Sequence, residues 1–274
     1  MTIKTILSLG AGVQSSTLAL MAAKGELEPM PDLAIFADTG YEPQAIYKWL
    51  NWLEKQLPFP VVRVSAGNIR DDCSAAELGK RDGTKVASLP YFTKNPKTDH
   101  IGLLRRQCTA IYKIEPIEKY VRREVLGLKY RQRAPKNHVI DMWMGISFDE
   151  IQRMKVPFVV PWQRNVYPLI EKRLRRGDCL AWMEKNHYPL PHRSACLCCP
   201  FHSDKHWLSI KNGDAKEWQD VVAFDKAIRK TADEKFGELY LHKSCKPLDE
   251  VEFFDLEELG QMSLLDECEG MCGV

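Results

Sequence analysis

The first half of the chain alternates short apolar runs with amphipathic stretches. The apolar runs predict strands over 5–9, 33–37, 61–64 and 139–146. Apolar residues at helical spacing predict a helix over 44–57, which Pro58 ends, and a second helix over 109–126. Strands that alternate with helices predict an α/β fold with a doubly wound, mostly parallel sheet.

The pattern changes along the rest of the chain. Residues 67–100 are polar and predict a mobile insertion that closes over a ligand, and 158–162 is expected to be extended. Beyond about Tyr167, prolines, cysteines and two predicted helices, 204–212 and 214–231, indicate a small cysteine-rich subdomain. We therefore expect two units, residues 1–166 and residues 167–274.

Three predicted strands end in residues suited to ligand binding. The first ends in a loop with Gly10 and Gly12, the second in Asp38-Thr39-Gly40, and the fourth in Gly145-Ile146-Ser147. Such loops meet at the carboxyl edge of an open α/β sheet. A glycine turn before a helix favours phosphate, because backbone amides and the helix dipole face the anion. A tight turn capped by Ser15 or Ser16 is the alternative.

Charge is unevenly distributed over the 274 residues. Residues 67–136 hold 16 Lys or Arg against 8 acids, while 247–274 hold nine acids and no Lys or Arg. The basic part fits nucleotide phosphates or a nucleic-acid backbone, and a solvated face is the alternative. Within it, Arg106 and Lys113 are candidates to neutralise phosphate or sulfate, and Asp149, Glu150 and Arg153 to add a polar wall.

The sequence predicts both a cellular compartment and a role for the cysteines. No apolar signal segment and no bilayer-spanning run is present, which predicts a cytoplasmic protein without a membrane partner. Nine cysteines without a secretory signal favour a metal or redox role over disulfides. The run Cys196-Leu197-Cys198-Cys199-Pro200 contains a C-x2-C pair followed by proline, a pattern typical of iron–sulfur ligands.

Four motifs occur in order along the first 153 residues: SLGAGVQSST (8–17), FADTGYEP (36–43), RQCTAIYKIEP (106–116) and WMGISFDEIQR (143–153). Together they resemble the phosphoadenosine phosphosulfate (PAPS) reductase superfamily, relatives of the PP-loop ATP pyrophosphatases. CLCCPF (196–201), YLHKSCKPL (240–248) and CEGMCGV (268–274) resemble its cysteine-rich subgroup, which is common in phages. The resemblance implies an adenine nucleotide alpha-hydrolase fold, which is Rossmann-like.

The resemblance also implies site residues. Nucleotide contacts are expected at Ser8, Gly10, Gly12, Gln14, Ser15, Ser16, Asp38, Thr39, Gly40, Gly145 and Ser147. Catalytic roles are expected for Lys113, Arg106, Cys268 and Cys272, the last two as a relay for sulfur or electrons or, alternatively, as part of a frayed tail. A [4Fe–4S] cluster is expected on Cys108, Cys196, Cys199 and Cys245, of which Cys108 and Cys245 are chosen because each lies inside a family-like motif.

Other metal assignments stay open. Zinc on Cys196, Cys199, His202 and His206 has a spacing too compact for a finger, whereas zinc with Cys245 and ordinary buried thiols are further alternatives. Cys73 and Cys179 are expected to be structural, and the side chain of Cys198 is expected to point away from its neighbour's.

We therefore expect an adenine-nucleotide-dependent sulfur-transfer enzyme that uses ATP and Mg²⁺ to adenylylate an acceptor, including a nucleic acid, with a sulfur or electron donor protein as partner. Gln14 replaces the loop aspartate of the pyrophosphatases, which weakens the case for Mg²⁺ and ATP cleavage. Some PAPS reductases carry glutamine there, so PAPS reduction to sulfite is one alternative, although their terminal Glu-Cys-Gly-Leu-His motif is missing. A nucleotide-binding regulator without turnover is the other.

Overall fold

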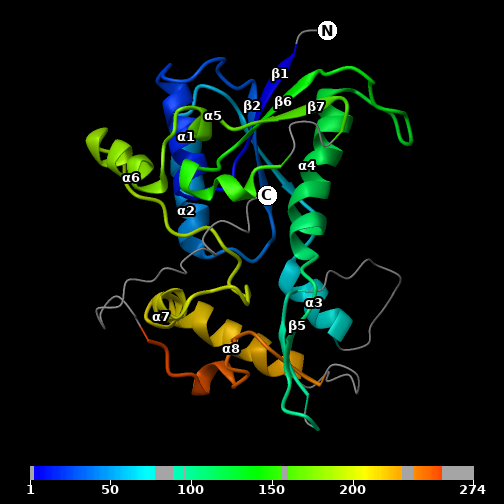
Figure 1. Cartoon of the computed structure of the whole chain (residues 1–274), viewed down its shortest axis with the longest axis vertical. Helices are drawn as coiled ribbons and strands as arrows, with labels where there is room; N and C mark the ends of the chain where they lie inside the picture. The colour runs from blue at the N-terminus through cyan, green and yellow to red at the C-terminus, as the bar shows by residue number, and fades with distance from the viewer. Residues whose placement is uncertain (1–2, 78–88, 96, 156–159, 230–236, 255–274) are drawn as a thin grey trace.

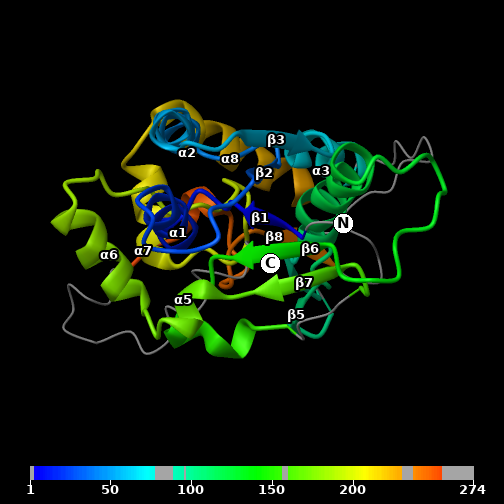
Figure 2. The same ribbon diagram turned by 90° about the horizontal axis from the view of Figure 1, so that it is seen from above.

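Five parallel strands form the main sheet of the computed structural model, which describes residues 3–77, 89–95, 97–155, 160–229 and 237–254. Their order is β3-β2-β1-β6-β7 (Figures 1 and 2). The strands are β1 (Lys4–Ser8), β2 (Leu33–Asp38), β3 (Val61–Ser65), β6 (Ile140–Met144) and β7 (Gln163–Val166). The predicted doubly wound parallel sheet is confirmed, and its strand order reverses between β1 and β6.

The register brings the ends of the two central strands level. Ser8, the last residue of β1, pairs with Met144, the last residue of β6. The chain after β1 and the chain after β6 therefore leave the sheet side by side. In open α/β sheets, ligands bind at this reversal point.

One face of the sheet is covered by α1 (Val13–Ala23) and α2 (Gln44–Leu53), as Figure 1 shows. The predicted stripe of α2 is buried, and a short turn, η1 (Glu54–Gln56), extends the helix towards Pro58. Helix α6 (Arg176–Lys185) packs beside α1 and adds Cys179 and Met183 to the same core.

The other face carries a helix that runs over residues 110–125. It consists of η2 (Ala110–Ile114), α4 (Glu115–Tyr120) and η3 (Val121–Val125), of which η2 and η3 are π-helical. Val121 packs in one core with Ile6 of β1 and Met142 of β6. The predicted helix over 109–126 is confirmed, with Lys113 in its first turn.

A second layer of structure lies below the sheet in Figure 1. It contains the antiparallel strands β5 (Ile101–Leu103), β4 (Phe92–Lys94) and β8 (Glu238–Tyr240), in that order. Helices α3 (Ile69–Glu77), α7 (Asp204–Lys211) and α8 (Ala215–Arg229) pack with them. Helices α7 and α8 agree with the two helices predicted there.

The polar stretch 67–100 differs from the predicted mobile insertion. Ile69, Leu89 and Tyr91 are buried against Trp207 and Phe224, because the apolar residues spaced through this stretch pack onto α7 and α8. Residues 78–88 and 96 lie outside the described part of the chain. Since β4 pairs with β8, residues on either side of position 166 share one sheet and one core.

The remaining described elements are short: η4 (Phe148–Arg153), α5 (Pro168–Glu171) and η5 (Leu248–Glu250). Of the predicted extended segment 158–162, residues 158–159 lie outside the described chain, and β7 begins directly after Trp162. In the described ranges, every helix is too short or too polar to cross a membrane.

Candidate functional site

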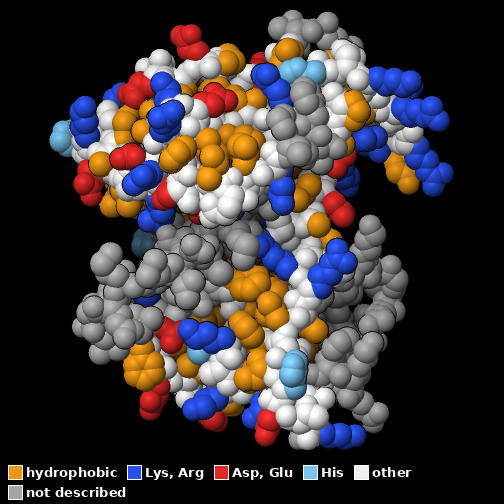
Figure 3. Space-filling model, viewed as in Figure 1, with side chains coloured by type: hydrophobic (Ala, Val, Ile, Leu, Met, Phe, Trp, Pro, Cys, Tyr) orange, Lys and Arg blue, Asp and Glu red, His pale blue; other side chains and the backbone are white. Residues whose placement is uncertain are grey.

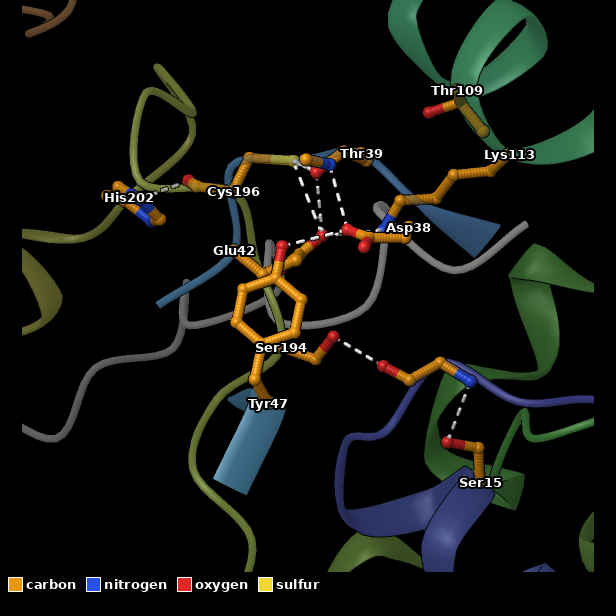
Figure 4. Close-up of polar contacts among 12 residues, drawn as sticks. Ser15, Asp38, Thr39, Glu42, Tyr47, Thr109, Lys113, Ser194, Cys196 and His202 are labelled. Atoms are coloured by element: carbon orange, nitrogen blue, oxygen red, sulfur yellow. Dashed lines mark hydrogen bonds and ion pairs between the residues drawn. The ribbon is translucent and has the colours of Figure 1, made fainter. Parts of the chain in front are cut away.

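The loop between β1 and α1 is held in a tight turn. Ala11 has a φ of 57°, and Gly12 caps α1 in an extended conformation. The Gly10 amide donates to Ser15 Oγ at 3.2 Å, so the loop folds back on the first turn of α1 (Figure 4). The amides at the start of α1, which have no partner inside the helix, thereby face the carboxyl edge of the sheet.

The end of β6 closes on this loop. A Cβ atom added at Gly145 would lie 2.7 Å from the Cα of Ser15, so only glycine fits there. Gln14 Nε2 lies 3.5 Å from Oγ of the buried Ser147 and donates to Glu150 Oε2 at 3.1 Å. The fold thus brings together four predicted nucleotide contacts, Gln14, Ser15, Gly145 and Ser147.

Glu150 places a carboxylate beside the loop that has glutamine in place of aspartate. Its partner is Arg153, whose Nη1 lies 2.7 Å from Glu150 Oε2. Burial raises the pKa of Glu150 above its ordinary value, and the charge of Arg153 opposes that rise. The polar wall predicted at these residues is therefore an ion pair that contacts the loop through Gln14.

Two predicted contacts point elsewhere. Ser16 is completely buried, and its Oγ accepts a hydrogen bond from Trp49 Nε1 at 3.0 Å, which ties α1 to α2. Ser8 lines a cavity of about 340 Å³ between the sheet and the helix over 110–125. Lys113 and the apolar side chains of Met144 and Trp162 line the same cavity.

The loop after β2 is organised by Asp38. Its Oδ1 accepts from the Gly40 amide at 2.8 Å and from the Tyr47 hydroxyl at 2.8 Å. Burial, together with this carboxylate, raises the pKa of Tyr47. Gly40 has a φ of 73°, and a Cβ there would lie 3.0 Å from the Cα of Asn68. Asp38 and Gly40 therefore shape the turn that presents Thr39.

Thr39, Glu42, Lys113 and Cys196 form a group that we call the Glu42 cluster (Figure 4). Thr39 Oγ1 donates to Glu42 Oε1 at 3.1 Å and lies 3.2 Å from Cys196 Sγ. Cys196 Sγ lies 3.5 Å and Lys113 Nζ 3.8 Å from the same Glu42 oxygen. The Glu42 side chain is only 1% exposed. A carboxylate buried this deeply is stable beside a cation and hydrogen-bond donors.

Glu42 was missing from the predicted site. The available signal was its position in the motif FADTGYEP, four residues after Asp38. Nothing in the spacing shows that a glutamate in an exposed-looking turn is covered by a cysteine 154 residues later.

The Glu42 cluster borders a closed pocket that we call the thiol pocket. Three predicted cluster ligands, Cys108, Cys196 and Cys199, line it with Arg106, Thr109 and Lys113, among others. Arg106 Nη2 donates to Thr109 Oγ1, and its guanidinium lies 5.9 Å from the centre of the Phe201 ring. The volume is about 20 Å³, less than the share of one water in the liquid.

The fourth predicted ligand, Cys245, does not line the thiol pocket. Its Sγ faces the carbonyl oxygen of Thr93 at 3.9 Å, beside β4. Cys198 lies closer to the pocket: it is completely buried, and its pKa is raised by burial and by the neighbouring thiols of Cys196, Cys73 and Cys108. Cys179 packs under α1, where burial raises its pKa to about 12, as expected of a structural thiol.

The thiols of the pocket have the donor chemistry of an iron site but not its spacing. Within the described ranges, no three His, Cys, Asp or Glu side chains are arranged to hold a metal ion. The three thiols of the pocket suit iron by donor chemistry, because soft thiolates bind iron–sulfur clusters. The pocket has only about 20 Å³, so the segment of Cys108 and the segment of Cys196 and Cys199 must separate to admit a cluster. Cys268 and Cys272 lie outside the described residues.

Two buried histidines follow the cysteines. His202 Nε2 lies 3.0 Å from the carbonyl oxygen of Cys196, and its ring is 4.2 Å from that of His206. His202 Nδ1 and His206 Nε2 have no hydrogen-bond partner among the described residues. Burial lowers the pKa of His202 and lowers that of His206 to about 3, so both rings are neutral. In the part of the chain that the structure describes, they do not form a metal-binding group with Cys196 and Cys199.

One segment joins the two sides of the site. Ser194 Oγ donates to the carbonyl oxygen of Gly10, and the Leu197 amide donates to that of Tyr41 at 3.0 Å. Ser194 was also missing from the predicted site. The cysteine segment therefore lies across the loop after β1 and the loop after β2. These features define a doubly wound α/β protein with a candidate anion site at the sheet reversal and buried thiols beside it.

Two solved structures are similar to this chain. PAPS reductase from Candida auris, in a phosphate complex, is 16% identical with a TM-score of 0.39 over 69% of this chain and 74% of its own. U34-tRNA thiolase NcsA from Methanococcus maripaludis, with its [4Fe-4S] cluster, is 15% identical with a TM-score of 0.39 over 92% and 78%. No family model and no curated protein matches the chain.

Proposed function

We propose that this protein is an adenine-nucleotide-dependent sulfur-transfer enzyme. ATP binds with its phosphates at the loop after β1, where backbone amides and the start of α1 favour negative charge. An acceptor oxygen attacks the α-phosphorus, a P–O bond forms, and pyrophosphate leaves. A sulfide-level sulfur then displaces AMP from the acceptor. The class of reaction agrees with the PAPS reductase and the tRNA thiolase named above.

The cysteine segment over both loops carries the proposal. Ser194 contacts the Gly10 carbonyl of the phosphate side, and Cys196, two residues later, contacts Thr39 and Glu42 on the other. Thiols are thereby held against the same carboxyl edge as the candidate anion site.

Each charged side chain has a role in the proposal. Lys113 neutralises phosphate charge that develops during attack, and Glu42 positions its ammonium group. Arg106, which precedes the helix over 110–125 and lines the thiol pocket, supplies a second cation. Cys108, Cys196 and Cys199 would hold a cluster, which supplies a thiophilic iron for sulfur. Glu150 offers the hard carboxylate oxygen that Mg²⁺ prefers and that Gln14 lacks.

PAPS reduction is the second candidate, and the observation in its favour is Gln14. Because residue 14 is glutamine, the loop has no carboxylate of its own. The Gln14 amide lies against Glu150 and Ser147. In that reaction a cysteine thiolate attacks the sulfur of PAPS, adenosine 3′,5′-bisphosphate leaves, and the cysteine carries the sulfonate. The two thiols of a dithiol donor then release sulfite and become a disulfide. Cys268 and Cys272 remain the proposed thiols.

An anaerobic assay separates the two candidates. Protein purified without oxygen is incubated with α-labelled ATP, Mg²⁺, sulfide as the sulfur source and bulk RNA or denatured DNA, and in parallel with PAPS and a thioredoxin-type donor. We expect pyrophosphate and thiolated polymer in the first mixture. Sulfite in the second mixture alone would replace sulfur transfer by PAPS reduction, and neither product would refute both.

The structure supplies a matched pair of variants for the cluster. Cys199→Ser removes a thiol from the pocket, whereas Cys245→Ser removes an equally buried thiol outside it. We expect Cys199→Ser to lose bound iron and thiolation, and Cys245→Ser to keep both. Equal iron loss in the two variants would instead restore Cys245 as a ligand.

A further inference from the structure

The loop that follows the helix over 110–125 is strongly basic. Residues 122–136 hold one acid, Glu124, and six cations: Arg122, Arg123, Lys129, Arg131, Arg133 and Lys136. In Figure 3, Lys and Arg side chains gather at the corner where Figure 1 draws this loop. Among the described residues, no carboxylate pairs with Arg131, Arg133 or Lys136.

An aromatic ring stands in the middle of these cations. Tyr130 is 76% exposed, which is high for a residue whose ring is mostly apolar. The guanidinium carbons of Arg123 and Arg131 lie 5.4 and 5.2 Å from its centre. A ring flanked by guanidinium groups is a stacking platform, because nucleobases stack on both.

Hydrogen bonds within the loop fix the backbone on either side of Tyr130. Gln132 donates its amide to Lys129 O at 3.0 Å, and its side chain accepts from the Lys129 amide at 2.8 Å. Arg122 and Arg123 donate to the carbonyl oxygens of Gln132 and Leu128. Arg131 has a φ of 62°, an uncommon conformation for a residue with a side chain. The turn is therefore ordered before any partner binds, which lowers the entropy cost of binding.

The position of the loop indicates that a ligand which contacts both the loop and the candidate site is a polymer. It follows the far end of the helix that begins near Lys113. Val125 lies twelve positions after Lys113, which at an α-helical rise of about 1.5 Å per residue is up to about 18 Å. A mononucleotide in the candidate site cannot reach Tyr130, whereas a strand of several nucleotides can contact both.

We propose that residues 122–136 bind a single-stranded segment of nucleic acid, with an unpaired base stacked on Tyr130 and phosphates held by Arg131 and Arg133. The inference depends on the proposed function at one point only, namely that the bound strand is part of the acceptor. Binding itself needs neither ATP nor the thiols.

The test is fluorescence anisotropy with a labelled 20-nucleotide single strand, as RNA and as DNA, against a duplex of the same sequence. Arg131→Ser/Arg133→Ser should weaken single-strand binding by at least about tenfold and lower the slope of log K against log salt by about 1.4, at about 0.7 per phosphate. Lys185→Ser/Lys216→Ser, which removes two exposed lysines elsewhere, should bind as the wild type does.

Substitutions at Tyr130 separate stacking from charge. Tyr130→Ala should weaken single-strand binding by about tenfold with an unchanged salt slope, and Tyr130→Phe should restore it. An unaffected Tyr130→Ala, or equal affinity for the duplex, would reduce the loop to a general polyanion contact and overturn the proposal. So would an Arg131→Ser/Arg133→Ser variant that binds like the lysine control.

The design keeps the two proposals apart. Anisotropy is measured without ATP and repeated with Cys196→Ser protein. Strand binding that passes these tests while no pyrophosphate is ever released would refute the sulfur-transfer enzyme and leave the binding surface standing.

Discussion

The two sides of the candidate site are built from different materials. On the side of β1 and β6, backbone groups make the site, and a glycine is needed because Gly145 touches the Ser15 backbone. On the side of the Glu42 cluster, buried and half-buried side chains from three segments make it: Thr39 with Glu42, Cys108 with Lys113, and Cys196. The first side depends on close approach of two chains, and the second on compensation of buried charge.

This difference has a consequence for substitutions. A backbone site fails when an atom is added, whereas a buried polar cluster fails when a charge or a donor is removed. Changes on one side should therefore leave the other intact. Gly145→Val and Trp49→Phe test the backbone side, and His206→Phe tests the burial of polar groups behind the cysteines.

Gly145→Val should have the largest effect. Its added atoms meet the Ser15 backbone, so the loop must shift, nucleotide affinity should fall by more than about tenfold, and the unfolding free energy by about 1–3 kcal/mol. Calorimetric titration with ATP and urea unfolding measure the two. Gly177→Ala, where no atom lies within 4 Å of the new Cβ, is the neutral control. Loss of bound iron as well would show that the two sides are coupled.

His206→Phe should change the pH dependence of stability. His206 titrates near its ordinary value of 6.5 when unfolded, but burial lowers its folded pKa to about 3. Below pH 6.5 the unfolded chain therefore binds a proton that the folded chain does not, and stability falls as the pH drops toward 3. The variant should lose less stability than the wild type between pH 7 and pH 5, by about 2 kcal/mol.

Urea unfolding at several pH values checks this prediction. His202 titrates in the same direction and is retained in both proteins, so only the difference between them is informative. Parallel curves would mean that His206 is protonated in the folded chain.

Trp49→Phe should have the smallest effect. It removes the indole N–H that Ser16 Oγ accepts and keeps an aromatic ring in the core. The unfolding free energy should fall by about 1 kcal/mol from the lost hydrogen bond, with some further loss from the smaller ring. Nucleotide affinity should be unchanged, and a large decrease would show that Ser16 acts in the phosphate site as the motif predicts.

Local patterns predicted most of the sheet correctly. The four predicted strands and the helices over 44–57 and 109–126 are present, because apolar spacing and Pro58 act within a few residues. The same patterns missed the pairing of β4 with β8, in which Phe92 pairs with Tyr240 and Lys94 with Glu238, far apart along the chain. Pairing over such a distance depends on which apolar surfaces remain uncovered, and periodicity does not show that.

The site divides in the same way. Gln14, Ser15, Gly145 and Ser147 meet as predicted, because each follows the carboxyl end of a parallel strand. Among the cysteines, spacing predicted Cys196 and Cys199, and the family-like motifs predicted Cys108 and Cys245. The first three line the thiol pocket, but Cys245 lies at Thr93 instead. Sequence motifs place a cysteine in a segment without saying where that segment packs.

The sequence by itself determined a parallel α/β sheet with a glycine turn at its reversal, since strand ends, glycines and helix starts are local features. Only the tertiary structure decided that Glu42 is buried beneath Cys196 and that Ser194 rests on the Gly10 carbonyl. The physical reason is that burial of a charge and contact between distant segments depend on the packing of the whole chain. No window of neighbouring residues contains that information.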